Sequence, residues 1–184
     1  MPELKNLKPS LLGCYLTGSL IGLYSSKDKK LDLSLRLATR LLDKAVKEYL
    51  MVRDLVLLAA TENAMTFEEI EKRGEGQYLH EIGITNHIEN CINALGRIYL
   101  LMPGSDSSSS SPKIREMRNM VEHMDEKINR GVTGPIGLDI SEDATHIEIF
   151  FRNKKNTHEE VLSLSTGKLA DELKRLHSFI SQQL

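Results

Sequence analysis

Apolar side chains recur at intervals of three and four residues over most of the chain, the spacing of one face of an α-helix. This pattern predicts helices over about residues 6–24, 31–60, 78–102 and 112–129, and an amphipathic helix that closes the chain. The apolar positions of the closing helix are Leu169, Leu173, Leu176, Phe179 and Ile180. Ser25 to Asp28 is a short polar connection, so the first two helices are expected to form a helical hairpin.

After residue 131 the apolar side chains recur at every second residue instead of every third or fourth. Residues 145–151 alternate in the way typical of a strand, residues 152–158 resemble a hairpin loop, and residues 161–164 form the partner strand. Residues 138–140 add a short third strand. The expected fold is therefore mainly α: an antiparallel helical bundle over residues 1–130, with a small C-terminal β-hairpin and a terminal helix over 131–184 packed on it.

A serine-rich run separates two of the predicted helices. The low-complexity composition of Ser105 to Ser111 predicts a flexible, solvated loop. Ser111 is then a candidate N-cap, and Pro112 occupies the first position of the next helix, where proline is favoured. Gly131, together with Gly134 and Pro135, is expected to end that helix.

Composition and charge narrow the functional classes. The 40% hydrophobic and 27% charged residues are ordinary for a globular protein, so the chain can bury a core. A formal charge of −2 gives no general attraction for a polyanion, and any nucleic-acid contact would need a local patch. Cys14 and Cys91 stand far apart and outside any C-x-x-C spacing, which excludes a disulfide framework or a zinc knuckle. A reducing cytoplasm is the expected location.

Residues 11–24, which follow Lys5 and Lys8, have some features of a signal peptide. The segment is shorter than the roughly 20 residues that span a bilayer. It contains Thr17 and Ser19, and no small-x-small cleavage site follows it at a suitable distance. We therefore expect a helix of the bundle there, and no association with a membrane.

Candidate chemistry is concentrated in the segment Arg118 to His123. On a helix, the apolar stripe formed by Ile114, Met117, Met120, Val121, Met124 and Ile128 faces the bundle. Asn119 and His123 are four residues apart on the opposite, polar face, with Arg118 between the two faces. The simplest interpretation is an ordinary solvated helix on which Arg118 pairs with Glu122 and His123 is in water.

The arrangement Arg118-Asn119-(x3)-His123 also resembles the signature of the HEPN family, in which an arginine, often followed by a polar residue, precedes a histidine. The resemblance covers mainly residues 31–130. It implies a helical bundle, commonly dimeric, in which the motif helices of two subunits meet to form a cleft for RNA. The β-hairpin and terminal helix depart from the usual all-helical unit of that family. The acidic Asp125 and Glu126 would repel a phosphate unless they face away.

The resemblance implies a metal-independent endoribonuclease that needs no cofactor, because RNA supplies its own nucleophile, the 2′-hydroxyl. His123 would be the general base or acid, since histidine exchanges protons near neutral pH. Arg118 would hold the phosphate, and Asn119 would orient His123 or a phosphate oxygen. Such a homodimer would act as a toxin or defence component, held in check by an antitoxin or regulatory partner. A non-catalytic helical interaction module, binding RNA, a nucleotide or a protein partner, is the competing hypothesis.

Two other groups of residues have simpler explanations. His80, His87 and Cys91 share one stripe of a predicted helix, but two helical turns separate the two histidines, roughly 10 Å, which is too far for a single ion. We interpret these positions as packing residues. The basic residues between 152 and 155 are interpreted as a solvated hairpin tip.

Overall fold

The computed structural model describes residues 1–4, 7, 10–20, 28–62, 68–69, 72, 79–123, 126, 129, 138–141, 143–151 and 160–184. Its helices are α1 (Leu11–Leu20), α2 (Lys29–Glu62), α4 (Leu79–Leu101), α5 (Ser111–Glu122) and α7 (Thr166–Ser181). Its strands are β1 (Asp139–Ile140), β2 (His146–Phe151) and β3 (Glu160–Ser165). The prediction of a mainly helical fold with a small C-terminal sheet and a terminal helix is confirmed.

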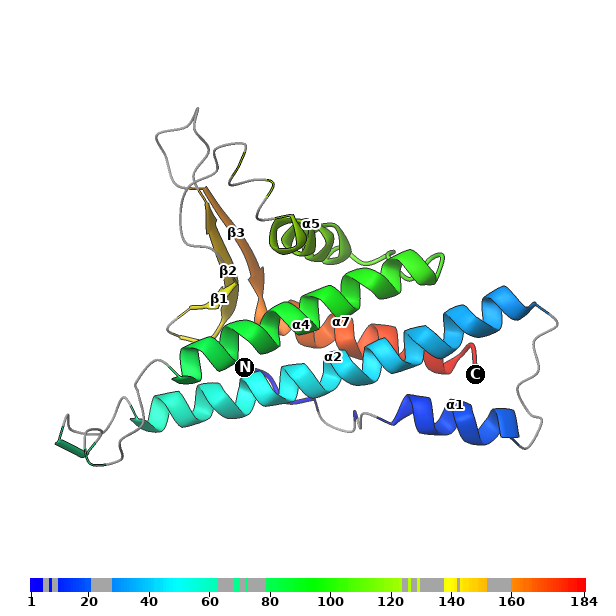
Figure 1. Ribbon diagram of the computed structural model, residues 1–184, viewed down its shortest axis with the longest axis horizontal. Coiled ribbons are helices and arrows are strands. Elements are labelled where there is room, and N and C mark those ends of the chain that lie inside the picture. The colour runs from blue at the N-terminus through cyan, green and yellow to red at the C-terminus, as the bar shows by residue number, and fades with distance from the viewer. Residues whose placement is uncertain are drawn as a thin grey trace.

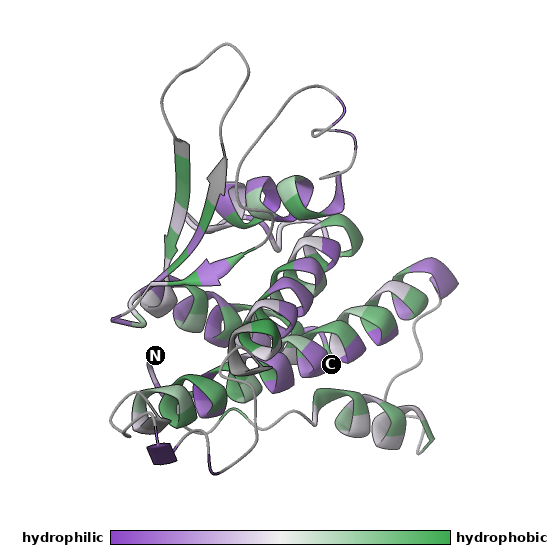
Figure 2. Ribbon diagram, turned by 60° about the vertical axis from the view of Figure 1, so that its left-hand side comes forward, coloured by the Kyte–Doolittle hydropathy of each residue, from purple (hydrophilic) through white to green (hydrophobic). Residues whose placement is uncertain are grey.

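The long helices α2 and α4 form the central antiparallel pair (Figure 1). Helix α1 lies along α2, α5 packs across α4, and α7 packs against α2 and β3. Helices α2, α5 and α7 carry apolar residues on one side and polar residues on the other (Figure 2). The fully buried side chains come from α2, α4, α5, α7 and the sheet, and include Leu42, Tyr49, Ile88, Leu95, Ile114, Ile149, Leu164 and Leu173. Removal of this apolar surface from water is the main stabilising contribution.

The sheet has the order β1-β2-β3, and both strand pairs are antiparallel. In β2 the side chains of Ile147 and Ile149 are buried, as the predicted alternation requires. Strand β3 runs directly into α7. The backbone N–H of Thr166 donates to the carbonyl of Thr145 at 2.8 Å, which fixes the start of α7 against the turn before β2. The three predicted strands agree with the observed ones to within a residue or two at each end.

Helix α1 begins at Leu11, later than the predicted residue 6. The carboxylate of Asp43, on α2, accepts hydrogen bonds from the backbone N–H groups of Leu11 (3.0 Å) and Leu12 (2.9 Å). A side chain from another helix thus satisfies donors that the first turn of α1 cannot pair internally. The hydroxyl of Tyr15 donates to Oδ1 of Asp32 at 2.6 Å, which confirms the hairpin with α2. Residues 21–27 lie outside the described part of the chain.

Helix α5 also differs from its predicted bounds. Its N-cap is Ser110, whose side chain makes no capping hydrogen bond, and Ser111 is already helical. Helix α5 ends at Glu122, and His123 is its C-cap with φ −115° and ψ 27°. Of the predicted residues beyond it, Glu126 and Asn129 are helical, while residues 124–125 and 127–128 lie outside the described part of the chain. Within the helix, Ile114, Met117 and Met120 are buried as predicted, whereas Met124 and Ile128 lie outside the described residues.

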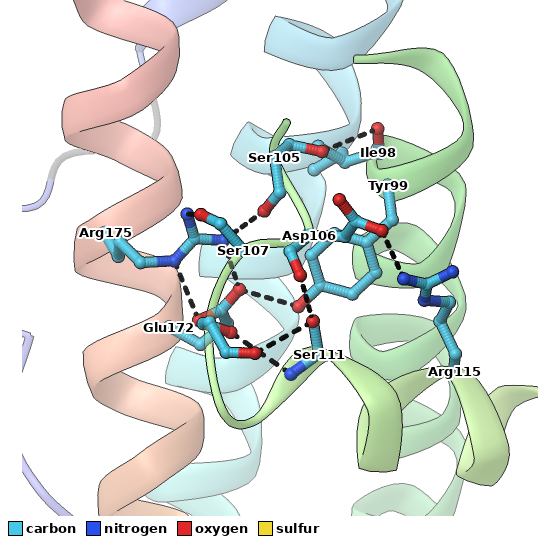
Figure 3. A network of polar contacts seen from close by, with 10 residues as sticks. Ile98, Tyr99, Ser105, Asp106, Ser107, Ser111, Arg115, Glu172 and Arg175 are labelled. Atoms are coloured by element: carbon cyan, nitrogen blue, oxygen red, sulfur yellow. Dashed lines mark hydrogen bonds and ion pairs between the residues drawn. The ribbon is translucent and has the colours of Figure 1, made fainter. Parts of the chain in front are cut away.

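The serine-rich loop is anchored to the helices and is not the solvated segment predicted. Ser105, Ser110 and Ser111 are buried. The Ser111 hydroxyl donates to the carbonyls of Asp106 (2.5 Å) and Ser108 (3.0 Å), and Arg175 of α7 donates to the carbonyl of Ser105 (Figure 3). Composition alone could not show the contact with Arg175, because this residue lies on a helix seventy positions away from Ser105.

The buried carboxylate of Glu172 is the centre of that network. Its Oε1 accepts hydrogen bonds from the Tyr99 hydroxyl (2.7 Å) and from Nη2 of Arg175 (2.6 Å), and its Oε2 accepts from Nε of Arg175 (3.0 Å) (Figure 3). Burial by itself would raise the pKa of Glu172, but hydrogen bonds from Arg175, Ser108 and Tyr99 bring it below its usual value. Helices α4 and α7 are therefore joined by an ionised, hydrogen-bonded carboxylate.

None of the helices in the described ranges combines the length and the apolar character required to cross a lipid bilayer.

Candidate functional site

Arg118 lies on α5 at the boundary between its buried and exposed sides. Its side chain is 18% exposed, and its Nη2 lies 2.5 Å from Oε2 of Glu122, one turn later on the helix. Its Nε is buried and has no hydrogen-bond partner among the residues that the structure describes. A buried donor without a partner is costly and uncommon in folded proteins. The guanidinium is thus held in place while one of its donors is unused.

Gly96 of α4 allows Arg118 to reach this position. A Cβ atom built on Gly96 would lie 2.2 Å from Cδ and 3.3 Å from Nε of Arg118. The aliphatic part of the arginine therefore packs directly on the backbone of α4, where any larger residue would displace it. Sequence reasoning missed this contact, because nothing in the helical pattern marks Gly96 as the neighbour of Arg118.

Asn119 and His123 are exposed on the outer side of α5, as predicted. His123 has a side chain that is 52% exposed, and its Nδ1 lies 3.5 Å from Oε1 of Glu126. Its backbone N–H donates to the carbonyl of Asn119 at 3.2 Å, which keeps the ring close to the end of the helix. Among the described residues, no hydrogen bond or ion pair joins Arg118 to either of these side chains. The three residues thus share one end of α5 without forming a closed constellation in a single chain.

Both basic side chains of the segment face a carboxylate: Arg118 faces Glu122, and His123 faces Glu126. The Arg118 pair is the one that the solvated-helix interpretation predicts. A phosphate ligand would have to replace these carboxylates or approach beside them, because like charges repel at short range. Arg118 could bind a phosphate oxygen and His123 could move a proton, provided that a second surface brings the ligand to both.

The alternative stripe on α4 has packing roles in its described part. Cys91 is fully buried, and burial raises the pKa of its thiol. His87 pairs through Nδ1 with a carboxylate oxygen of Glu48 on α2, whereas the side chain of His80 lies outside the described residues. Within the described ranges no group of three metal-ligating side chains is found. The predicted basic hairpin tip, residues 152–155, also lies outside them.

A second polar site was not anticipated from the sequence. A pocket of about 330 Å³ opens where α5 and α7 begin, beside β2 and β3, and it is lined by Lys113, His146, Lys168 and four serines together with Leu164. Both lysines are the third residue of their helix, and each follows an N-cap serine by three positions, Ser110 or Ser165. The repeated Ser-x-x-Lys spacing at two helix starts is the signal that could have revealed it.

Comparison of the chain with protein-family models, with curated proteins and with solved structures gave no match.

Proposed function

We propose that the protein is an endoribonuclease of HEPN type that acts without a metal ion, with Arg118 and His123 as its catalytic residues and Asn119 as a positioning residue. The observation that carries the proposal is the state of Arg118: its guanidinium is fixed between Gly96 and Glu122, and its buried Nε has no partner among the described residues. The guanidinium is held in one position and its side chain is 18% exposed, so its accessible part is suited to bind an anionic oxygen.

In the proposed reaction, the 2′-oxygen of a ribose attacks the adjacent phosphorus, and the bond from phosphorus to the 5′-oxygen breaks. His123 accepts the proton of the 2′-hydroxyl, or donates one to the departing 5′-oxygen. Arg118 stabilises the negative charge that develops on the phosphate oxygens. Asn119 orients the ring or a phosphate oxygen. The products would be a 2′,3′-cyclic phosphate and a 5′-hydroxyl.

The catalytic unit is proposed to be a homodimer. His123 is 52% exposed, and among the described residues no hydrogen bond or ion pair joins it to Arg118 of the same chain, so the two side chains form no closed site within one chain. A two-fold axis beside α5 would place Arg118 of one protomer near His123 of the other. The resulting groove would bind a single strand of RNA. A toxin or defence role, with an inhibitory protein partner, follows only as a corollary of this activity.

The test is cleavage of single-stranded RNA by the full chain in the presence of EDTA. Arg118→Ala and His123→Ala should each lower the rate about 100-fold or more, whereas Arg40→Ala removes an exposed arginine of α2 and should change nothing. Each variant is first checked for unaltered unfolding by circular dichroism. Wild-type protein that leaves RNA intact, or variants that cleave as well as wild type, would contradict the proposal.

A mixing experiment tests the dimer. Equal amounts of Arg118→Ala and His123→Ala protein, each inactive alone, should regain activity when their subunits exchange, because the heterodimer contains one intact composite site. Absence of recovery, with subunit exchange verified by native mass spectrometry, would place both residues in the same-chain site instead.

The ion pair of Arg118 with Glu122 and the position of the His123 ring beside Glu126 favour a second candidate, the non-catalytic interaction module. Basic side chains that already have carboxylate neighbours are typical of a solvated helix end. RNA that binds tightly to the wild-type protein and is never cleaved would support this alternative over the endoribonuclease.

A further inference from the structure

The pocket at the start of α5 and α7 is separate from the segment Arg118 to His123 and contains none of its residues. Two lysines from different helices line it, Lys113 and Lys168, and no acidic residue does. Neither ammonium group forms an ion pair or hydrogen bond with the described residues. Both lysines are exposed, so they can move onto a ligand, and the pocket walls supply hydroxyl groups beside them.

Ser110 provides an independent indication of a ligand. It is 8% exposed, more than nine-tenths buried, and it lines the pocket. Its side chain does not cap α5, and its hydroxyl has no hydrogen-bond partner among the described residues. An unpaired hydroxyl in the wall of a pocket is available to a polar group that enters it.

At the two helix starts beside the pocket, the N–H groups of Ser111 and Thr166 already donate to the carbonyls of Ser108 and Thr145, and Pro112 has no N–H. The N-cap serines Ser110 and Ser165 line the pocket, and neither caps its helix with its side chain. The first-turn N–H groups of a helix have no partner inside the helix and carry partial positive charge. Helices of 12 and 16 residues therefore present their positive ends to the same space as the two lysines.

His146, the first residue of β2, adds a further polar group. Its Nδ1 lies 2.8 Å from the hydroxyl oxygen of Thr145, which fixes the ring. One wall serine, Ser163, is already engaged, because its hydroxyl donates to Oε1 of Glu148 at 3.3 Å. That carboxylate does not line the pocket. The ligand-facing groups are thus cationic side chains, hydroxyls and an imidazole.

We propose that this pocket binds the terminal phosphate group of a small phosphorylated molecule, such as a nucleoside monophosphate. A phosphate monoester carries a charge of about −1.5 to −2 at neutral pH, which matches two lysines, whereas a phosphodiester carries only one charge. The volume of about 330 Å³ is at the lower end of small-molecule sites. The free end of a 5′-phosphorylated RNA presents the same group, so the two sources are separated by experiment.

The experiment is calorimetric titration of the full chain at constant ionic strength, with inorganic phosphate, adenosine monophosphate, and short RNAs that carry either a 5′-phosphate or a 5′-hydroxyl. Wild-type protein should bind phosphate at one saturable site. Lys113→Gln and Lys168→Gln should each weaken binding about tenfold, the loss of one charge-assisted hydrogen bond. Ser110→Ala should weaken it by a smaller factor.

Lys174→Gln is the matched control, since this exposed lysine of α7 pairs with Asp171 away from the pocket and its loss should leave binding unchanged.

Adenosine monophosphate that binds more tightly than 5′-phosphorylated RNA assigns the site to a free small molecule. The reverse order assigns the phosphate to an RNA end and overturns the small-molecule part. Wild-type protein that does not saturate with phosphate, or binds equally well after both lysine substitutions, overturns the site itself. None of these outcomes bears on the endoribonuclease proposal, which is tested by RNA cleavage.

Discussion

A methyl group on Gly96 would lie 2.2 Å from Cδ of Arg118, so α4 accepts this arginine only because residue 96 has no side chain. The contact sets where the guanidinium lies. Glu122, one turn further along α5, holds the guanidinium there through an ion pair. Three residues from two helices therefore define the geometry of the candidate site, and each can be changed separately.

Gly96→Ala should destabilise the protein by about 1–2 kcal/mol, because the cost of overpacking exceeds the gain that alanine usually brings to a helix. Urea unfolding measures the change. In contrast, Gly13→Ala on α1 should be neutral or stabilising by up to about 1 kcal/mol, since a Cβ there meets no atom within 4 Å.

A double variant tests whether the effect of Gly96→Ala on stability depends on Arg118. In the double variant Gly96→Ala with Arg118→Ala the clash is absent, so the two changes should cost less together than the sum of their separate effects. Simple additivity, or a Gly96→Ala protein as stable as Gly13→Ala, would show that Arg118 does not depend on Gly96.

Glu122→Gln should release the guanidinium of Arg118 from its carboxylate partner. A partly exposed pair one turn apart contributes about 0.5 kcal/mol, so the unfolding free energy should hardly change. The affinity for single-stranded RNA, measured by fluorescence anisotropy, should rise about threefold to tenfold, because a phosphate no longer competes with the carboxylate. A fall in affinity would mean that Glu122 positions Arg118 for binding.

Glu172→Gln should destabilise the protein by about 1–3 kcal/mol, because Arg175 and Tyr99 would lose a buried ionised acceptor. The neighbouring Asp171→Asn, which changes an exposed carboxylate, is the matched control and should have little effect. Thermal unfolding at pH 7 measures both. Equal stability of the two variants would contradict a central role for Glu172.

Glu172 also gives a pH dependence of defined sign. Its pKa is lowered in the folded protein, so the unfolded chain binds its proton more readily. Its stabilising contribution is present above the unfolded value, about 4.3, and is lost as the pH falls through the folded pKa. Wild-type protein should therefore lose stability in acid by more than Glu172→Gln does, in unfolding measured from pH 6 to pH 3.

His177 should titrate below the ordinary histidine range. Burial lowers its pKa, and the negative charge of Asp43 partly opposes that effect. Asp43→Asn should thus lower the His177 pKa further, while the single carbonyl oxygen of asparagine can still accept one of the two hydrogen bonds from the first turn of α1. Titration of the imidazole protons by NMR checks both values, and an unchanged or raised pKa in the variant would exclude the influence of Asp43.

The helices, the strands and the side of each that faces the core could be predicted from the amino-acid sequence, because they follow from the local spacing of apolar residues, with periods of 3.6 and 2. It placed Asn119 and His123 on the outer side of α5 and Arg118 at its boundary, and it foresaw the pair with Glu122. These are relations within one helical turn or two, where chain geometry leaves little freedom.

The contacts between those elements could be seen only in the folded protein. Asp43 starts α1 from another helix, Arg175 anchors a serine loop that composition describes as solvated, and Gly96 makes room for Arg118. The pocket between Lys113 and Lys168 likewise exists because two helix starts, more than fifty residues apart, converge on one sheet. Such contacts depend on how the elements pack, which local patterns do not encode.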